Sequence, residues 1–387
     1  MTNQFDYLSW RGDLSFSQDK FNEVDGSILA MLSYVDYDAI SKEPIILRRA
    51  TEGYCPEKKY DSVRLGLIIP SKKINQIFCM AGESARFGDC LISDFESRTS
   101  REENCQFAAV TYHLSCNKAV ICFRGTDDSL VGWREDCALS YLDEIPAQAL
   151  AVKYFERMAE KYPTKKFYFV GHSKGGNLAL YVAVSCREEL RGRIIRAYSY
   201  DGPGLSSKLA RSKSFTAIKR KLCIIVPQSS FIGTMFDVRG HYTVVHGTMR
   251  GPYQHDCFTW EVEKNAFVRM PELSARGKKN AEQFRESMAR MSEEEKRELV
   301  KIIFSAIEST GAESLTDLTS GTPKKLVTLI KSYNGVDKEK RAMAVSMILK
   351  LFDLKPHKSE AGNSEPRSAS RLSSGAEQKR EKVQNAK

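Results

Sequence analysis

The chain has 387 residues, with 59 Lys and Arg against 49 Asp and Glu and a formal net charge of +10. With 42% hydrophobic and 28% charged residues, its composition is that of a globular protein rather than a disordered or fibrous one. The sequence has no apolar run long enough to span a bilayer, and its N-terminus lacks the basic and apolar segments of a signal peptide. We therefore expect a soluble protein located in the cytoplasm.

The ten cysteines are scattered along the chain and form no C-x-x-C pair. Cys122, Cys186 and Cys223 fall in apolar segments that we predict to be buried. This distribution favours free thiols in a reducing compartment over a disulfide framework or a zinc site. The sequence also contains neither a G-x-x-x-x-G-K-[ST] phosphate loop nor an H-E-x-x-H zinc motif, so we expect no cofactor and no metal.

The first hundred residues are predicted to be mainly helical after an irregular start. Residues 1–24 are expected to form a loop or edge strand that aromatic side chains anchor. The Asp-Gly-Ser triplet at 25–27 precedes apolar residues at helical spacing, which indicates a helix over 24–40. The helical period continues through most of 41–103, and a short strand is predicted at 91–95.

The middle of the chain alternates strand and helix patterns. Runs at 106–113 and 118–123 flank a Ser-Cys-Asn turn and predict a hairpin, whereas 130–145 is expected to be a loop. This alternation predicts the α/β class with a mainly parallel central sheet. The remaining predicted strands lie at 167–170, 194–200, 222–226, 242–246 and 257–262, and predicted helices lie at 146–161 and 177–184.

The composition changes at about residue 274. The Ser-Glu-Glu-Glu segment at 292–295 is a capping box that predicts a helix start, and further helices are predicted at 322–335 and 337–352. Residues 356–387 are rich in Ser, Lys, Arg and Glu and have no aromatic residue, which is typical of disorder. We therefore predict an α/β domain over 1–273, a helical appendage over 274–354 and a disordered tail over 355–387.

The segment Gly171-His172-Ser173-Lys174-Gly175 is a G-x-S-x-G motif between a predicted strand and a predicted helix. In that context the motif forms a nucleophile elbow, a strained turn that points the serine hydroxyl out of the sheet. The two flanking glycines remove side chains that would collide with the adjoining strand and helix. The backbone N–H of Lys174, at the helix N-terminus, would point at a developing oxyanion.

Candidate partners for Ser173 follow from chain order, because this fold class places the acid and then the histidine after the serine. Outside the tail, that order leaves His241, His246 and His255 as bases. We favour His255, which lies in a loop between two predicted strands, and keep His246 as the main alternative. For the acid we favour Asp201, at the end of the strand after the elbow helix, where functional residues gather in open sheets. Asp237 is the alternative acid, and a turn-forming role for Asp201 in Asp-Gly-Pro-Gly stays open.

An ordered set of motifs resembles the class 3 (fungal-type) lipases of the α/β-hydrolase superfamily. The set comprises Phe-Arg-Gly-Thr at 123–126, Gly-Trp at 132–133 with Asp136, and the elbow. A narrower resemblance is to a bacterial branch of that group. It rests on the elbow extended to Asn-Leu-Ala and on three further segments: Tyr-Asp-Gly-Pro-Gly at 200–204, Val-Pro-Gln-Ser-Ser-Phe-Ile-Gly at 226–233 and Gln-His-Asp at 254–256. The resemblance covers roughly residues 20–265. It implies a lipase-like α/β-hydrolase fold for the domain over 1–273. It also implies Ser173 as nucleophile, His255 as base, and Thr126 and the Lys174 N–H as oxyanion donors.

The sequence departs from the lipases at two places. The lipases have Leu or a similar residue after the serine, where this chain has Lys174, so we expect a cation over the site that would favour anionic substrates. The lipases also carry their acid in an Asp-x-Val-Pro segment after the next strand, where this chain has Gln-Ser-Ser at 228–230. The acid has therefore moved, to Asp201 in our interpretation, or has been lost.

These residues predict a serine hydrolase that cleaves carboxylic esters, of lipid or lysophospholipid type, through a Ser-His-Asp acyl-enzyme mechanism. The alternative is a catalytically silent hydrolase-fold module that binds a lipid or protein partner. The positive net charge would permit peripheral contact with an anionic membrane. The sequence has no basic motif interleaved with aromatic residues, so we expect no nucleic-acid partner.

Overall fold

The computed structural model describes residues 2–52 and 71–312, together with the single positions 314, 317, 342 and 345. The predicted helix at 322–335, the predicted tail at 355–387 and all of the predicted helix at 337–352 except positions 342 and 345 lie outside the described residues, as does part of the segment 41–103. In the described part of the chain, no helix combines the length and the apolar character needed to cross a membrane.

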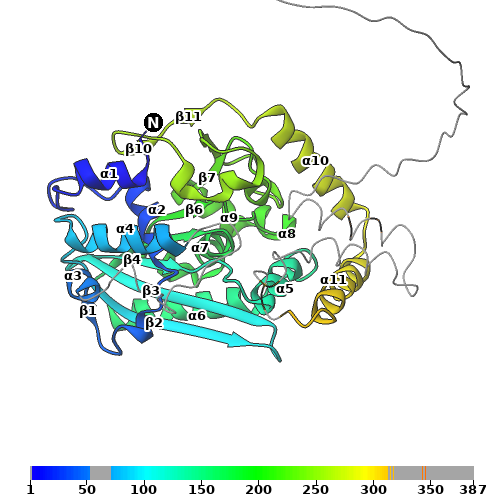
Figure 1. The fold of residues 1–387 in the computed structure, drawn as a ribbon. Helices are drawn as coiled ribbons and strands as arrows, with labels where there is room; N and C mark the ends of the chain where they lie inside the picture. Colours follow the sequence, from blue (N-terminus) through cyan, green and yellow to red (C-terminus); the bar gives the residue numbers. More distant parts are fainter. Residues whose placement is uncertain are drawn as a thin grey trace, which may run out of the picture.

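A central sheet of nine strands organises the described residues, in the order β1-β2-β3-β4-β5-β6-β7-β8-β11 (Figure 1). Its centre, β4 to β8, is parallel, while β1 to β4 and the pair β8 and β11 are antiparallel. The predicted α/β class with a largely parallel central sheet is confirmed. The strands are β1 (Ile45–Ile46), β2 (Leu91–Ser100), β3 (Cys105–Ser115), β4 (Lys118–Phe123), β5 (Lys166–His172), β6 (Ile194–Tyr200), β7 (Leu222–Pro227), β8 (Thr243–Val245) and β11 (Arg269–Met270).

Helices cover both faces of this sheet, because the strand side chains alternate between two apolar layers. Val120 and Cys122 of β4 belong to one core with helices α1 (Gln4–Arg11), α2 (Glu23–Leu32) and α4 (Ser71–Glu83). On the other face, alternate residues of β4 join a core with α6 (Pro146–Lys161), α7 (Lys174–Ser185) and α9 (Lys213–Ile218). The result is a three-layer arrangement with the parallel strands in the middle.

Several predicted strands are confirmed, whereas the one predicted at 257–262 is wrong. The hairpin is present as β3 and β4, and β5, β6 and β7 follow the predicted runs closely. At 257–262 the chain instead makes a 3-10 turn (Cys257–Thr259), in which the Phe258 N–H donates to the Asp256 side chain at 2.9 Å. Only β9 (Val262–Glu263) is extended, and it pairs with β10 (Ala266–Phe267) outside the main sheet. A side-chain cap therefore replaces the ladder here.

Two segments predicted as irregular are helical. Residues 4–11 form α1 rather than a loop or edge strand, because Asn3 and Asp6 make a capping box at its start. Within 130–145 the structure has α5 (Leu130–Ala138), which Ser129 caps. This helix has no single apolar stripe, because Leu130 packs outward against another helix while the carboxylate of Glu135 is buried inward. A periodicity search is blind to such a pattern.

The described part of the predicted appendage consists of α10 (Ala275–Ala289) and α11 (Glu293–Glu308). The predicted capping box at Ser292 and Glu295 is present at the start of α11. Figure 1 shows α11 beside α5, and the apolar side chains of the two helices form a third core cluster. Helix α10 reaches the loop after β7, where the rings of Phe284 and Phe231 lie 5.3 Å apart.

We expect Phe304→Ala to destabilise the packing of α11 on α5 by about 3 kcal/mol, because it empties a buried aromatic position. Phe304 is 3% exposed in the third cluster. Chemical denaturation would measure the loss, with the exposed Lys301→Ala on the same helix as control. Equal stability of the two variants would contradict the packing described here.

Candidate active site

Ser173 occupies a strained turn between β5 and α7. Its backbone angles, φ 56° and ψ −129°, are rare for a residue with a side chain and are typical of functional sites. The turn requires glycine at both flanking positions. A Cβ at position 171 would collide with the Gly175 carbonyl, and a Cβ at position 175 would collide with the Phe123 carbonyl. The Ser173 N–H donates to the Tyr200 carbonyl oxygen at 3.1 Å, which fixes the turn to β6.

The structure brings His255 and Asp201 together across 54 residues of sequence. His255 ends the turn Gly251–His255, and its Nδ1 lies 2.7 Å from Oδ2 of Asp201. The His255 side chain is 12% exposed and that of Asp201 only 1%. With Asp201 ionised, Nδ1 is the donor in this pair, so the lone pair of the imidazole is on Nε2.

The second carboxylate oxygen of Asp201 is held from the loop after β7. Oδ1 accepts hydrogen bonds from the Ser230 hydroxyl and from the Gly233 N–H, the latter at 3.1 Å. Ser230 also accepts from the Gly233 N–H at 3.0 Å. The carboxylate therefore has its partners on both oxygens and one fixed orientation toward His255.

The alternative residues are engaged elsewhere. The Asp237 carboxylate accepts from the Arg239 N–H at 2.7 Å, within its own turn. His246 Nδ1 lies 2.7 Å from Glu261 Oε2, and His241 Nε2 lies 3.2 Å from the Leu222 carbonyl oxygen. Of the predicted acids and bases, Asp201 and His255 are therefore the ones that form a pair.

His172 supports the His255 turn from below. Its Nε2 lies 2.7 Å from the His255 carbonyl oxygen, and the two imidazole centroids are 4.4 Å apart. Burial lowers the pKa of His172 well below its usual range, and the neighbouring His255 adds to this effect. A neutral His172 must donate from Nε2 to that carbonyl, so its Nδ1 accepts from the Tyr34 hydroxyl at 3.3 Å. His172 is thus a packing residue.

The segment after β4 lies against the elbow. A Cβ at Gly125 would be 3.3 Å from the Ser173 Cβ, so the next residue, Thr126, is close to Ser173. The Thr126 hydroxyl donates to Oδ2 of Asp136, while Oδ1 of Asp136 is buried without a hydrogen-bond partner among the described residues. Burial raises the pKa of Asp136 to about 6, although the charge of Lys174 opposes the rise.

The expectation that the Lys174 cation lies over the site is wrong. The side chain of Lys174 is fully buried, and its Nζ lies 2.9 Å from Oε2 of Glu135. The ammonium turns inward because it finds acceptors there, and the site has no positive charge from this residue. The backbone N–H of Lys174 is the first of α7, so it has no carbonyl partner within the helix.

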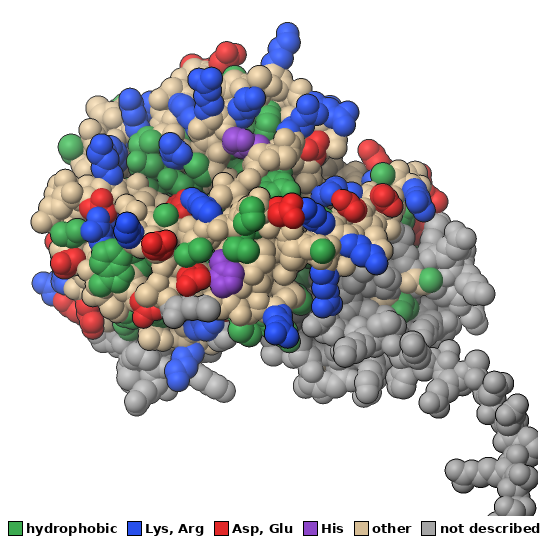
Figure 2. Space-filling model, turned by 90° about the horizontal axis from the view of Figure 1, so that it is seen from above, with side chains coloured by type: hydrophobic (Ala, Val, Ile, Leu, Met, Phe, Trp, Pro, Cys, Tyr) green, Lys and Arg blue, Asp and Glu red, His purple; other side chains and the backbone are tan. Residues whose placement is uncertain are grey.

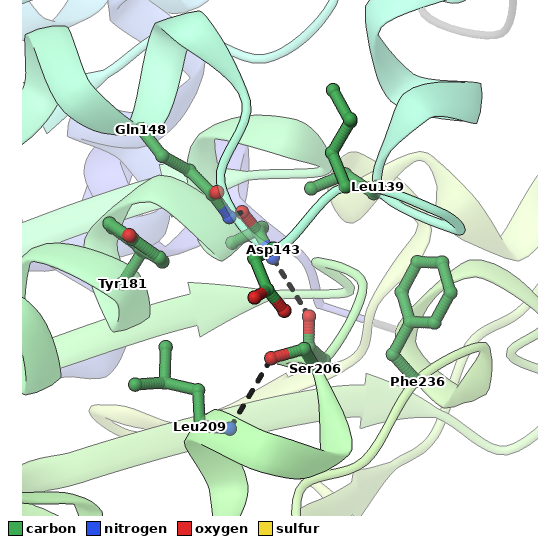
Figure 3. A pocket seen from close by; sticks show the side chains of 10 residues that line it. Leu139, Asp143, Gln148, Tyr181, Ser206, Leu209 and Phe236 are labelled. Carbon is green, nitrogen blue, oxygen red and sulfur yellow. Dashed lines mark hydrogen bonds between the residues drawn. The ribbon is translucent and has the colours of Figure 1, made fainter. Parts of the chain in front are cut away.

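The loop that begins at Asp201 is anchored on α7, beside a hollow that is lined by side chains including Gln148, Ser206 and Phe236 (Figure 3). Gln148 Nε2 donates to Asn177 Oδ1 at 2.8 Å, and Asn177 Nδ2 donates to the Gly204 carbonyl at 2.8 Å. These amides line a hollow of about 260 Å³, counting space open to solvent, beside the apolar side chains of Leu139, Leu142, Leu209 and Phe236. These hydrogen-bonded amides hold the loop that begins at Asp201 in a fixed position relative to α7.

Sequence reasoning missed Glu135, Gln106, Ser230 and Gly233, which hold the predicted residues in place. In the sequence, Ser230 belongs to the segment 228–230 that lacks a carboxylate, and Gly233 ends the segment 226–233 that carries the resemblance. One signal for Glu135 was available, because a lysine at the start of a buried helix needs a buried acid. Its position in a segment predicted as a loop hid that partner.

A parallel sheet with a nucleophile elbow after β5 defines a fold of the α/β-hydrolase type. Residues 81–305 match the model of the Mbeg1-like family, and the chain belongs to that family. No curated protein matches the chain. The lipase-like fold that the motifs imply is thus supported, whereas the bacterial branch stays a prediction.

Several solved lipases are distantly similar to this chain. A fungal lipase in an inhibitor complex is 13% identical over 57% of this chain and 76% of that one, with a TM-score of 0.34. A second fungal lipase is 13% identical over 66% and 90%, with a TM-score of 0.37. The Lip2 lipase from Yarrowia lipolytica is 12% identical over 64% and 84%, with a TM-score of 0.32. We transfer no site residue from them.

The pKa of Asp136 predicts a pH dependence of stability. A carboxyl with a pKa of about 6 in the folded state and 3.8 in the unfolded state stabilises the fold below pH 3.8, and this contribution is lost as the pH rises through about 6. Asp136→Asn removes the titration. Wild type should therefore lose about 2 kcal/mol relative to the variant between about pH 4.5 and about pH 7.5.

Urea denaturation at both pH values would measure this difference. Asp89→Asn is the control, because the Asp89 side chain is 83% exposed. A difference between wild type and Asp136→Asn that is the same at both pH values would contradict a raised pKa at Asp136.

Proposed function

We propose that this protein is a serine hydrolase that cleaves carboxylic esters through an acyl-enzyme. The observation that carries the proposal is the hydrogen bond between His255 and the buried Asp201, on the same edge of the sheet as the strained turn at Ser173. A nucleophile, a base and an oriented carboxylate are the parts that acyl transfer requires.

In the proposed mechanism, Ser173 Oγ attacks the ester carbonyl while His255 Nε2 accepts the hydroxyl proton. Asp201 holds the Nδ1–H and stabilises the imidazolium that forms. The backbone N–H groups of Lys174 and Thr126 receive the oxyanion, since the Thr126 hydroxyl is already donated to Asp136. His255 then gives its proton to the leaving alcohol, which leaves an acyl-enzyme on Ser173. Water next attacks the acyl carbonyl while His255 accepts its proton, and His255 returns that proton to Ser173 Oγ as the carboxylic acid is released.

The acid in this proposal lies at the end of β6 rather than after β7. The loop after β7 has Ser230 and Gly233 in place of a carboxylate, and both donate to Asp201. In this proposal the end of β6 provides the carboxylate and the loop after β7 provides its hydrogen-bond donors, whereas in the lipase pattern the later loop carries the acid. The lack of a carboxylate at 228–230 was one reason to consider a silent module, and the pairing of Asp201 with His255 supports the active alternative.

For the substrate we propose a lipid or lysophospholipid ester, in keeping with the lipase-like family. Because Lys174 is buried, no charge of that residue favours anionic substrates. Figure 2 shows Lys and Arg side chains spread widely over one face, with Asp and Glu among them and hydrophobic patches between. We propose peripheral contact with an anionic membrane in the cytoplasm, through distributed charge rather than one basic patch, and no nucleic-acid partner.

Labelling by a fluorophosphonate probe tests the nucleophile. We expect wild type to be labelled and Ser173→Ala to be unlabelled, because the probe reacts with a serine that a base and an oxyanion hole activate. Turnover of short-chain p-nitrophenyl esters should show the same dependence. A folded wild-type protein that neither labels nor turns over would instead support a silent module that binds a lipid or protein partner.

Exchange of each candidate acid for its amide tests the triad. Asp201→Asn should lower kcat by about 10³- to 10⁴-fold, because Asn leaves the geometry but stabilises the wrong tautomer of His255. Asp237→Asn is the matched control and should keep kcat within about twofold, since its carboxylate lies in its own turn. Ester-hydrolysis kinetics on both folded variants would decide, and the reverse order of effects would assign the acid to Asp237.

A further inference from the structure

The side chain of Lys174 is fully buried and has a complete set of partners. Nζ donates to the Gln106 carbonyl oxygen at 2.7 Å, to Gln106 Oε1 at 2.5 Å and to Glu135 Oε2 at 2.9 Å. An ammonium has three N–H groups, so these acceptors satisfy all of them. Both Lys174 and Glu135 have side chains that are 0% exposed. The ammonium therefore has a single geometry.

Glu135 ties that ammonium to three other elements. Besides Lys174, its Oε2 accepts from the Gln106 N–H at 3.0 Å, at the start of β3, and its Oε1 accepts from the Ala147 N–H at 2.9 Å, at the start of α6. Burial opposes the charge on Lys174, but the charges of Glu135 and Asp136 outweigh it and raise the pKa of Lys174. The pair is thus ionic, and it joins α5, α6, α7 and β3.

Helix α5 reaches both proposed oxyanion donors through neighbouring residues. Glu135 holds the side chain of Lys174, and Asp136 accepts the hydroxyl of Thr126. The two peptides whose N–H groups would receive the oxyanion are therefore attached to one helix. A shift of α5 would move both of them relative to Ser173.

A buried ion pair is seldom better for stability than apolar residues of the same volume, because both charges lose their hydration. What the pair supplies here is direction, since three hydrogen bonds of fixed geometry attach residue 174 to its surroundings. An apolar side chain at this position could pack in several rotamers and would not hold the peptide plane to the same degree.

We propose that the Lys174–Glu135 ion pair is a positioning device for the oxyanion hole, which orients the Lys174 N–H toward the substrate carbonyl from inside the fold. This inference rests on the proposed esterase function. Lys174 and Glu135 act through the peptide N–H and touch no substrate. Because an oxyanion forms only in the transition state, loss of the pair affects kcat and leaves KM nearly unchanged.

The first test is Glu135→Gln beside Asp25→Asn. Asp25 forms another fully buried ion pair, with Arg86 at 2.5 Å and both side chains 0% exposed, in the core on the opposite face of the sheet. The two variants make the same chemical change, one linked to the elbow and one not. We expect Glu135→Gln to lower kcat on a short-chain p-nitrophenyl ester by about 10- to 100-fold with KM within about twofold. Asp25→Asn should lower thermal stability and leave kcat within about twofold.

The second test is the double variant Lys174→Met/Glu135→Gln, which removes both charges and leaves no unpaired ion to prevent folding. It retains the backbone N–H at position 174 and should show the same loss of kcat. A folded double variant with wild-type kcat would overturn the proposal, and so would a double variant that fails to fold while Asp25→Asn folds. Failure of the esterase function is distinct, because wild type would then match Ser173→Ala.

Discussion

The close approach of three backbone segments at Ser173 is the constraint on which the site depends. Gly175 packs against the Phe123 carbonyl at the end of β4, Gly171 packs against the Gly175 carbonyl, and the Ser173 N–H bonds to β6. The turn is strained, so it persists only because these neighbours over-determine it. The parallel register of β4, β5 and β6 brings the ends of these strands to one edge. The packing of these strands thus imposes the strained turn and also determines the direction of the Ser173 hydroxyl.

The proposed acid, Asp201, shows how a fold can keep a geometry while the residue that provides it changes place. What His255 requires is a fixed, buried carboxylate at Nδ1, not a carboxylate from a particular strand. Asp201 supplies one from the end of β6, and the β7 loop supplies donors to its other oxygen. A search for an acid at 228–230, where the lipases have theirs, therefore finds no carboxylate, although Asp201 is paired with His255. Spatial contact with His255 therefore identifies the candidate acid, whereas the position of a motif in the sequence does not.

Much of the architecture was predictable, because it depends on local patterns. The runs that became β5, β6 and β7 and the capping box of α11 have strong periodic or capping signals. Asp201 and His255 could be ranked from chain order, but their 2.7 Å pairing depends on tertiary contact. Helix α5 could not be predicted, because it buries a carboxylate on one side and Leu130 on the other. The inward turn of Lys174 was hidden for the same reason, since its partner lies on that helix.

Helix α5 is polar on its inner side and apolar on its outer side, and the role proposed for the inner side depends on the packing of the outer side. Its inner side is polar and holds the peptides at Lys174 and Thr126, which requires a rigid helix. A helix of nine residues is too short to be stable by itself, so its rigidity must come from packing. The outer side obtains that packing from α11, through a cluster that includes Phe304. In our proposal, the capped, amphipathic α11 therefore supports the site without contacting it, because it packs against α5.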